Sequence, residues 1–368
     1  ADDEAHHFLA HLVLIQFDLL REGNTDSSEA INRIRECLAP NEGCKAPLVW
    51  GKMIQWARES AGKSGQFNRI RLVKDVSHLV QLRGAPSIVS DLNKLTELAR
   101  SYVSLIPDDI SGINIERSEL LDDYNTKLSA ARLLQIRGLP GSGKSVIMRQ
   151  AVERSLEHGP TIFIKAEQLE GTSWISYATS HGLSNIPLER LLVEVGAAGT
   201  NILFIDAIDR VERRYQSVIL DLFNTITNSP LLSDWRIVVS LRDSGVEILR
   251  NWLGDFIDTL RVETLQVEIF DDQESEILAN KKPQLRSLLF GADQVRNIVR
   301  RPFFAKILNQ GCLADPRNST FAPQSEIDLI ENWWRRGGYN EIGQIVVERQ
   351  RTLLELAKAR VSNLSQPI

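Results

Sequence analysis

The sequence predicts an α/β domain built on a parallel sheet, set between two helical regions. From residue 133 to about residue 270, short apolar runs alternate with longer segments of helical periodicity, which is typical of parallel sheets covered by helices. The regions before and after this part contain apolar positions at helical spacing only. We therefore expect three domains, at residues 1–107, 108–270 and 271–368.

The composition is that of an ordinary globular chain. Of its 368 residues, 43% are hydrophobic and 25% are charged, and the formal net charge of −5 gives no electrostatic footprint for unaided binding to duplex nucleic acid. No stretch reaches the roughly 18 apolar residues that a bilayer span needs, and the acidic start is not a secretion signal. Three cysteines are too few for a disulfide framework, so we expect reduced, buried thiols and a cytoplasmic location without membrane contact.

The two flanking regions are predicted to be helical. In the first region, an all-helical adaptor, helical periodicity covers residues 8–20, 30–38, 48–57 and 88–105. A turn-rich linker at 107–112 follows, and then a short extended piece and a helix within 113–131. In the last region, which we interpret as a helical lid that extends toward a winged-helix fold, the expected helices cover residues 274–288, 295–308, 325–337 and 348–359.

The central region contains the expected strands and the helices that connect them. Short apolar runs predict strands at residues 133–137, 161–165, 201–206, 236–241 and about 265–270. Helical segments between them lie at about 144–157, 187–197, 214–227 and 246–253.

A phosphate-binding loop follows the first of these strands. Residues 138–145 fit the pattern G-x-x-x-x-G-K-[ST], between a predicted strand and a predicted helix. The glycines let backbone N–H groups point at a diphosphate, and the helix adds the positive end of its dipole. Lys144 supplies charge to the β and γ phosphates, and Ser145 supplies a hydroxyl for Mg²⁺. The predicted site for ATP or ADP with Mg²⁺ consists of Gly138, Leu139, Pro140, Gly141, Ser142, Gly143, Lys144, Ser145 and Val146.

A second strand ends in the acid that such a loop requires. Asp206 closes the apolar run 201–206, the Walker B form, and is placed to hold Mg²⁺ through water. Asp209 is the nearest acid that can orient or deprotonate an attacking water, although pairing with Arg210 on a solvated face is an alternative. Ala207 stands where many motor ATPases have a catalytic Glu, which predicts slow or gated hydrolysis.

Arg242 follows the fourth predicted strand. Because strand ends of an open α/β sheet face the ligand crevice, we expect Arg242 to reach the γ-phosphate and to report its presence. The alternative is a surface arginine in a turn.

These segments resemble those of STAND nucleotide switches, the signal-transduction ATPases that include NACHT and NB-ARC proteins and are related to AAA+ ATPases. Residues 204–210, FIDAIDR, are similar to the Walker B form of that family, although Arg210 replaces its final acid. Residues 238–242, VVSLR, resemble the family's sensor strand, with Arg242 at the position of its arginine.

Two further segments resemble the parts of STAND proteins that border the adenine. Ile115 and Arg117 lie in a stretch similar to the short segment before the P-loop, with Glu116 in place of its usual Gly. Pro302 matches the proline of the helical domain that packs on the base, without the usual Gly. The resemblance implies that these three residues contact the nucleotide.

The resemblance implies a regulatory switch that binds ATP, hydrolyses it slowly and self-associates according to nucleotide state. Residues 333–339 and 349–357 make the chain similar to bacterial STAND proteins of antiphage and other conflict systems. In such proteins, effector and sensor regions lie at opposite ends. The first residue is not Met, and we expect this chain to be the core of a larger protein. The absence of a guanine-reading motif favours ATP.

Two rival functions stay open. The first is an AAA+ remodeller or loader with brisk hydrolysis, for which Arg213, Arg214, Arg300 and Arg301 are candidate arginine fingers. The second is a scaffold that binds nucleotide for stability alone. The arginine pairs at 213–214, 300–301 and 335–336 also leave nucleic-acid contact as an alternative, but a solvated helix face is the default interpretation of such pairs.

Overall fold

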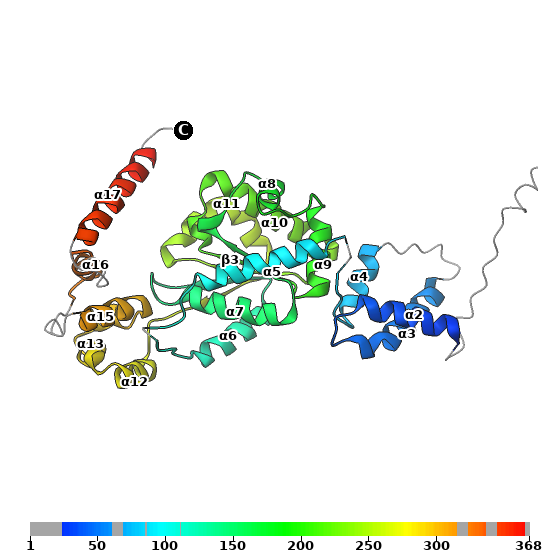
Figure 1. Cartoon of the computed structure of the whole chain (residues 1–368), viewed down its shortest axis with the longest axis horizontal. Coiled ribbons are helices and arrows are strands. Elements are labelled where there is room, and N and C mark those ends of the chain that lie inside the picture. The colour runs from blue at the N-terminus through cyan, green and yellow to red at the C-terminus, as the bar shows by residue number, and fades with distance from the viewer. Residues whose placement is uncertain are drawn as a thin grey trace, which may run out of the picture.

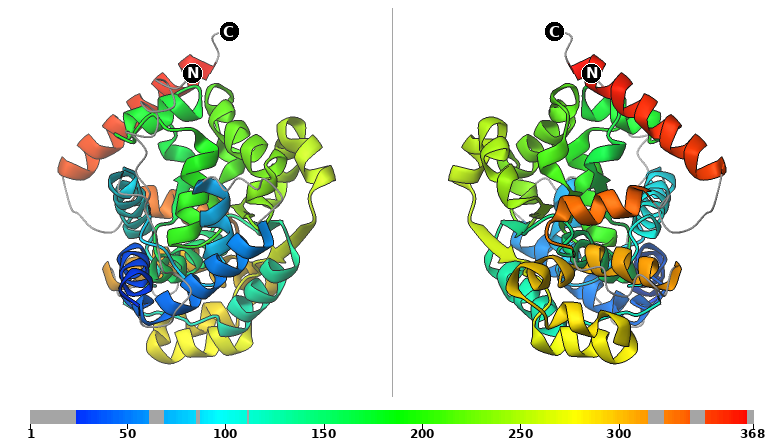
Figure 2. Two further views of the ribbon diagram at one scale, coloured as in Figure 1. Left: turned by 90° about the vertical axis from the view of Figure 1, so that its right-hand side faces the viewer. Right: turned by 90° about the vertical axis from the view of Figure 1, so that its left-hand side faces the viewer.

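The computed structural model describes residues 24–60, 69–84, 87–110, 112–314, 323–335 and 344–364. A central sheet with helices on both faces lies between the N-terminal helices and the C-terminal helices (Figure 1). Figure 2 views the molecule from its two ends, with the blue N-terminal helices in front in one view and the yellow-to-red C-terminal helices in front in the other. The helix expected at 8–20 lies outside the described residues.

The sheet has five parallel strands in the order β2-β3-β4-β1-β5, which confirms the predicted α/β class with a parallel sheet. The strands are β1 (Leu133–Arg137), β2 (Ile162–Lys165), β3 (Ile202–Asp206), β4 (Arg236–Ser240) and β5 (Val262–Gln266). The three central strands are almost wholly buried, as expected where helices cover both faces. Strand β4 lies between β1 and β3, so the segments that follow these three strands are neighbours.

The last strand begins earlier than the sequence predicts. The expected range was about 265–270, whereas β5 pairs with β1 from Val262 onward. As an edge strand β5 mixes polar and apolar residues, and its apolar signal is weak. The apolar Val267 and Phe270, which suggested a strand, are buried just after it.

Helices cover both faces of the sheet. One face packs against α5 (Val89–Ser104), α6 (Ser118–Ala130) and α7 (Lys144–His158), in a core that includes Tyr102, Phe163 and Phe204. The other face packs against α8 (Trp174–Ser180), α9 (Leu188–Ala198), α10 (Gln216–Asn228) and α11 (Val246–Thr259). The predicted adaptor ends at residue 107, but α5 packs with the sheet rather than with the helices before it. The three-domain division itself stays a prediction.

The remaining N-terminal helices form a small core of their own. They are α2 (Thr25–Cys37), α3 (Ala46–Ser60) and α4 (Arg69–Ser77), of which the sequence did not predict α4. Leu38, Val49 and Val76 are buried among them. Cys37 and Cys44 are exposed, so the expectation of buried thiols is wrong for these two.

Within residues 271–314, 323–335 and 344–364 the chain forms only helices, and the winged-helix part stays a prediction. The helices are α12 (Asp272–Lys281), α13 (Arg286–Leu289), α14 (Asp293–Val299), α15 (Pro302–Ala314), α16 (Glu326–Arg335) and α17 (Gln344–Leu364). Each of the long helices expected at 274–288 and 295–308 is two helices, because Pro283 and Pro302 interrupt helical hydrogen bonding.

Short 3-10 helices complete the secondary structure. They are η1 (Gly43–Lys45), η2 (Ala166–Gln168), η3 (Ile208–Arg210), η4 (Arg213–Tyr215), η5 (Pro230–Leu232), η6 (Asp243–Gly245) and η7 (Pro283–Leu285). Among the described residues, no helix has both the length and the apolar character that a bilayer crossing requires.

Candidate nucleotide-binding site

The P-loop connects β1 to α7, and its backbone requires glycine. Gly143 has a φ of 102° and Gly138 a φ of 153°, conformations that side chains disfavour. A Cβ atom at Gly138 would also lie 2.5 Å from the carbonyl oxygen of Val267. The buried hydroxyl of Ser142 has no hydrogen-bond partner among the described residues. A loop of this shape, with an unpaired buried hydroxyl and a helix N-terminus beside it, fits a polyphosphate.

The ammonium of Lys144 lies over the same loop. Its Nζ donates to the carbonyl oxygens of Gly138, at 2.9 Å, and Leu139, at 2.8 Å. Burial lowers the pKa of Lys144 below its ordinary value, although the nearby carboxylates of Asp209, Asp243 and Asp206 act to raise it. The cation is thus held among backbone oxygens, which a phosphate can replace as acceptors.

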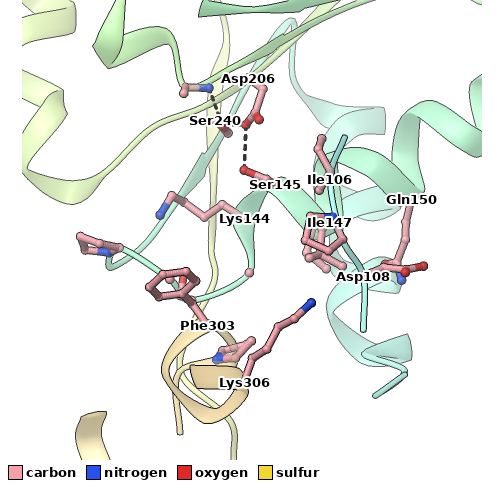
Figure 3. Close-up of a pocket in the computed structure, with 18 of the residues that line it drawn as sticks. Ile106, Asp108, Lys144, Ser145, Ile147, Gln150, Asp206, Ser240, Phe303 and Lys306 are labelled. Carbon is pink, nitrogen blue, oxygen red and sulfur yellow. Dashed lines mark hydrogen bonds between the residues drawn. The ribbon is translucent and has the colours of Figure 1, made fainter. Parts of the chain in front are cut away.

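Ser145 and Asp206 meet at the start of α7. The Ser145 hydroxyl donates to Oδ1 of Asp206 at 3.2 Å, and the Ser240 hydroxyl donates to the same oxygen (Figure 3). The backbone N–H of Ala207 donates to Ser240 Oγ at 2.8 Å. Asp206 is buried, so this network fixes its carboxylate. Ser240 was not among the predicted site residues, although it stands at the threonine position of the sensor strand that residues 238–242 resemble.

The oxygens of Ser145 and Asp206 fit Mg²⁺. This ion takes oxygen ligands and is usually held by one or two protein groups, with water and substrate phosphates completing its shell. Within the described part of the chain, no group of three or more His, Cys, Asp or Glu side chains could hold a metal. The donor set therefore suits an ion that arrives with a nucleotide rather than one held in an all-protein cage.

Asp209 is paired with Arg242. Arg242 Nε donates to Asp209 Oδ2 at 2.6 Å, and the Asp209 side chain is only 1% exposed. Arg210 instead forms an ion pair with Glu167 at 2.7 Å, so the alternative pairing of Arg210 with Asp209 is wrong. The structure thus brings the candidate base and the candidate sensor into contact with each other.

A cavity of about 380 Å³ lies beside these groups and is lined by all the predicted site residues except Gly138 and Leu139. The side chain of Leu139 is exposed. The cavity continues from the P-loop toward residues 105–110, which were predicted to be the end of a helix and a linker. The cavity is also lined by four residues that were not predicted, because helical periodicity does not show which face of α7 or α15 borders a ligand. These are Ile147, Gln150, Phe303 and Lys306.

Arg117 and Pro302 join the P-loop to the C-terminal helices. Arg117 Nε donates to Oε1 of Glu274 on α12 at 2.6 Å, and its other nitrogens donate to the carbonyl oxygens of Glu268, at 3.1 Å, and Ser142, at 3.4 Å. Pro302 Cγ lies 3.7 Å from the point where a Cβ atom on Gly143 would be. Ile115, which also lines the cavity, packs against the core of the C-terminal helices.

The fold and this loop geometry define an α/β P-loop domain. No protein-family profile matches the chain, and comparison with curated proteins gives no match. Among solved structures, the Walker-type ATPase PABY2304 of Pyrococcus abyssi is similar with 14% identity and a TM-score of 0.42, over 71% of this chain and 79% of that one.

Two structures of Hsp104 are also similar. The closed state with ATPγS and FITC-casein has 18% identity and a TM-score of 0.38 over 68% of this chain. The extended conformation of the S. cerevisiae Hsp104–casein complex has 16% identity and a TM-score of 0.34 over 69% of this chain. The chain spans 46% and 40% of the length of these two Hsp104 chains.

Proposed function

We propose that the chain is an ATP-binding regulatory switch of the STAND class, which hydrolyses ATP slowly and changes its conformation and self-association with nucleotide state. It would be the core of a larger bacterial defence or signalling protein, with effector and sensor regions outside this chain. The observation that carries the proposal is the contact of α15 with the P-loop: Phe303 N donates to Gly141 O at 3.3 Å.

Nucleotide binding is assigned to the P-loop, Lys144 and the Asp206 network. The loop N–H groups and Lys144 would hold the β and γ phosphates. Mg²⁺ between Ser145 and Asp206 would neutralise charge on the same phosphates. Ser240 positions Asp206, since both Ser145 and Ser240 donate to the same carboxylate oxygen.

Slow hydrolysis is supported by the chemistry at the end of β3. Ala207 has no carboxylate to activate water, and Oδ2 of Asp209 accepts from Arg242. For Asp209 to orient a water through that oxygen, Arg242 must turn toward the γ-phosphate. A carboxylate that is released only when the sensor engages the phosphate gives gated turnover.

The switch itself follows from differential binding. A nucleotide shifts a conformational equilibrium only by the difference between its affinities for the two states, and reversal of a strong preference takes about 5.5 kcal/mol. Charge-assisted hydrogen bonds to the γ-phosphate contribute about 1.5–3 kcal/mol each, so a few of them suffice. In this proposal, ADP holds α15 on the loop, and ATP with an upstream trigger releases it for self-association.

Of the four candidate arginine fingers for the AAA+ alternative, two are engaged within their own chain. Arg300 and Arg301 are buried and form ion pairs with Asp272 and Glu326 of their own chain. Arg213 and Arg214 are exposed on η4 and keep that alternative open. The burial of these two arginines weakens the case for nucleic-acid contact at residues 300–301.

ATP turnover and particle mass, measured on wild type, Lys144→Ala and the matched control Lys127→Ala, test the proposal. The switch predicts slow turnover that is lost in Lys144→Ala alone, and a mass by light scattering that differs between ADP and ATP in the full-length, triggered protein. Brisk turnover at constant mass would support the remodeller. Binding without any turnover would support the scaffold.

A further inference from the structure

Gln150 places a buried, unpaired carbonyl oxygen at the wall of the nucleotide cavity. The residue lies on α7, five positions after Ser145, and therefore about 7.5 Å further along the helix axis from the phosphate end. Its Oε1 is buried and has no hydrogen-bond partner among the described residues. Buried acceptors are nearly always paired in native proteins, so an unpaired one that borders a cavity indicates a ligand donor.

The charged neighbours at this end of the cavity already have partners within the chain. Asp108 lies 3.3 Å from a guanidinium nitrogen of Arg149. Lys306 Nζ donates to the carbonyl oxygen of Asp109 at 3.3 Å. Figure 3 shows Gln150 and Asp108 at the right of the site with Ile147 beside them, away from Asp206 and Ser240 at the top.

The rest of this end is apolar. Ile106 and Ile147 lie there beside Asp108 (Figure 3), and Ile110 and Ile113, next in the chain, also line the cavity. Apolar walls with one unpaired amide oxygen match a purine base, whose faces are apolar and whose edge carries hydrogen-bonding groups. The backbone N–H groups of Ile110 and Ile113 donate to each other's carbonyl oxygens, at 2.8 and 3.2 Å, and are not available as donors to that edge.

We infer that Gln150 reads the base of the nucleotide, its Oε1 accepting a hydrogen bond from the 6-amino group of adenine. Glutamine amides pair with adenine in this manner elsewhere, with the amide nitrogen donating to a ring nitrogen. Guanine has an acceptor, O6, at the same position and would need the amide to turn over. The inference rests on the proposed function and makes Gln150 the residue that contacts the amino group of adenine.

The test is a cycle of two proteins and two nucleotides. Kd is measured calorimetrically with Mg²⁺ for ATP and for purine riboside triphosphate, which lacks the 6-amino group, on wild type and Gln150→Leu. Loss of the amino group is expected to weaken binding to wild type about three- to tenfold, the value of one neutral hydrogen bond. In Gln150→Leu, which is expected to bind ATP correspondingly weakly, the two nucleotides should have nearly equal Kd.

Two further variants serve as controls. Gln216→Leu makes the same chemical change at the start of α10, away from the cavity, and should preserve the wild-type ratio of Kd values. If the ratio is preserved in Gln150→Leu but lost in Asp108→Ala, which removes the acceptor, Asp108 binds the amine and the inference is wrong. A ratio preserved in all variants also overturns it. If wild type binds no nucleotide at all, both the proposed function and the inference fail. If wild type binds ATP but the Kd ratio does not depend on Gln150, only the inference fails.

Discussion

Arg242, at the end of β4, donates to the carboxylate of Asp209, which lies on η3 just beyond the end of β3. Asp209 is almost fully buried, whereas the Arg242 side chain is 34% exposed and can reach another partner. Gly245 closes over the acid: a Cβ atom there would lie 2.4 Å from Asp209 Cβ. The geometry holds the carboxylate still and leaves the arginine as the movable partner.

Arg242→Ala is expected to destabilise the fold by about 1–3 kcal/mol, because it leaves the Asp209 carboxylate buried without its cation. The value lies below that for a fully buried pair because Arg242 is partly exposed. Urea unfolding measures it. In the matched variant Asp209→Asn/Arg242→Ala, the loss should be smaller than the sum of the two single losses. Equal stability of Arg242→Ala and wild type would show that the ion pair is not formed in solution.

Asp206→Asn is expected to remove most of the contribution of Mg²⁺ to ATP affinity. Asparagine can still accept from Ser145 and Ser240, so the hydroxyl network survives while the anionic ligand is lost. Affinity with Mg²⁺ should fall at least tenfold, or about 1.4 kcal/mol, while affinity in EDTA should change little. The comparison of the two conditions on one variant separates loss of the metal from loss of the fold. An equal fall in EDTA would contradict the metal role.

The order of strands and motifs explains which parts of the site could be predicted. Apolar runs placed the P-loop between a strand and a helix, and placed Asp206 at a strand end, because these depend on local pattern. The contact of Asp209 with Arg242 depends on β4 lying next to β3, and no local pattern specifies that neighbour. The edge strand β5 was misplaced for a related reason, since its half-exposed residues weaken the apolar signal.

Contacts between residues far apart in the sequence were also beyond reach. Arg117 was expected at the adenine, but its main partner is Glu274, which is 157 positions away. Gln150 lies on a helix whose burial pattern gives no hint that one face borders a cavity. Sequence patterns therefore predicted which residues form the P-loop, but not which ones join the loop to the helices around it.

Nucleotide binding at alkaline pH is expected to take up protons at Lys144. Burial lowers the pKa of Lys144 in the folded chain below its ordinary 10.5, so the folded state binds this proton less tightly than the unfolded state. The lowered pKa therefore reduces the free energy of unfolding at neutral pH. This loss of stability disappears as the pH rises through the folded pKa toward 10.5. Bound phosphate opposes the shift by raising that pKa.

Calorimetry in two buffers with different ionisation enthalpies, at an alkaline pH below 10.5, measures this uptake. Lys144→Met should bind nucleotide without proton uptake. In the absence of nucleotide, it should also be more stable than wild type at neutral pH, because it does not bury an ammonium group. Proton uptake of the same size in Lys144→Met would assign it to another group, and uptake absent from wild type would contradict the lowered pKa.

Arg117→Ala is expected to uncouple the C-terminal helices from the P-loop. Arg117 and Glu274 are each 13% exposed, and Arg117 also bonds to the Ser142 carbonyl oxygen in the loop. Loss of the arginine leaves Glu274 without its cation. This should destabilise the packing of α12 beside the P-loop by about 2–4 kcal/mol. Hydrogen exchange in α12 and α15 should therefore rise and should no longer differ between ADP and ATP. Arg286→Ala breaks an exposed ion pair between α13 and Glu276 of α12 and should leave the nucleotide dependence intact. If Arg117→Ala keeps that dependence, the coupling does not need Arg117, and the contact of Phe303 with Gly141 is the next candidate.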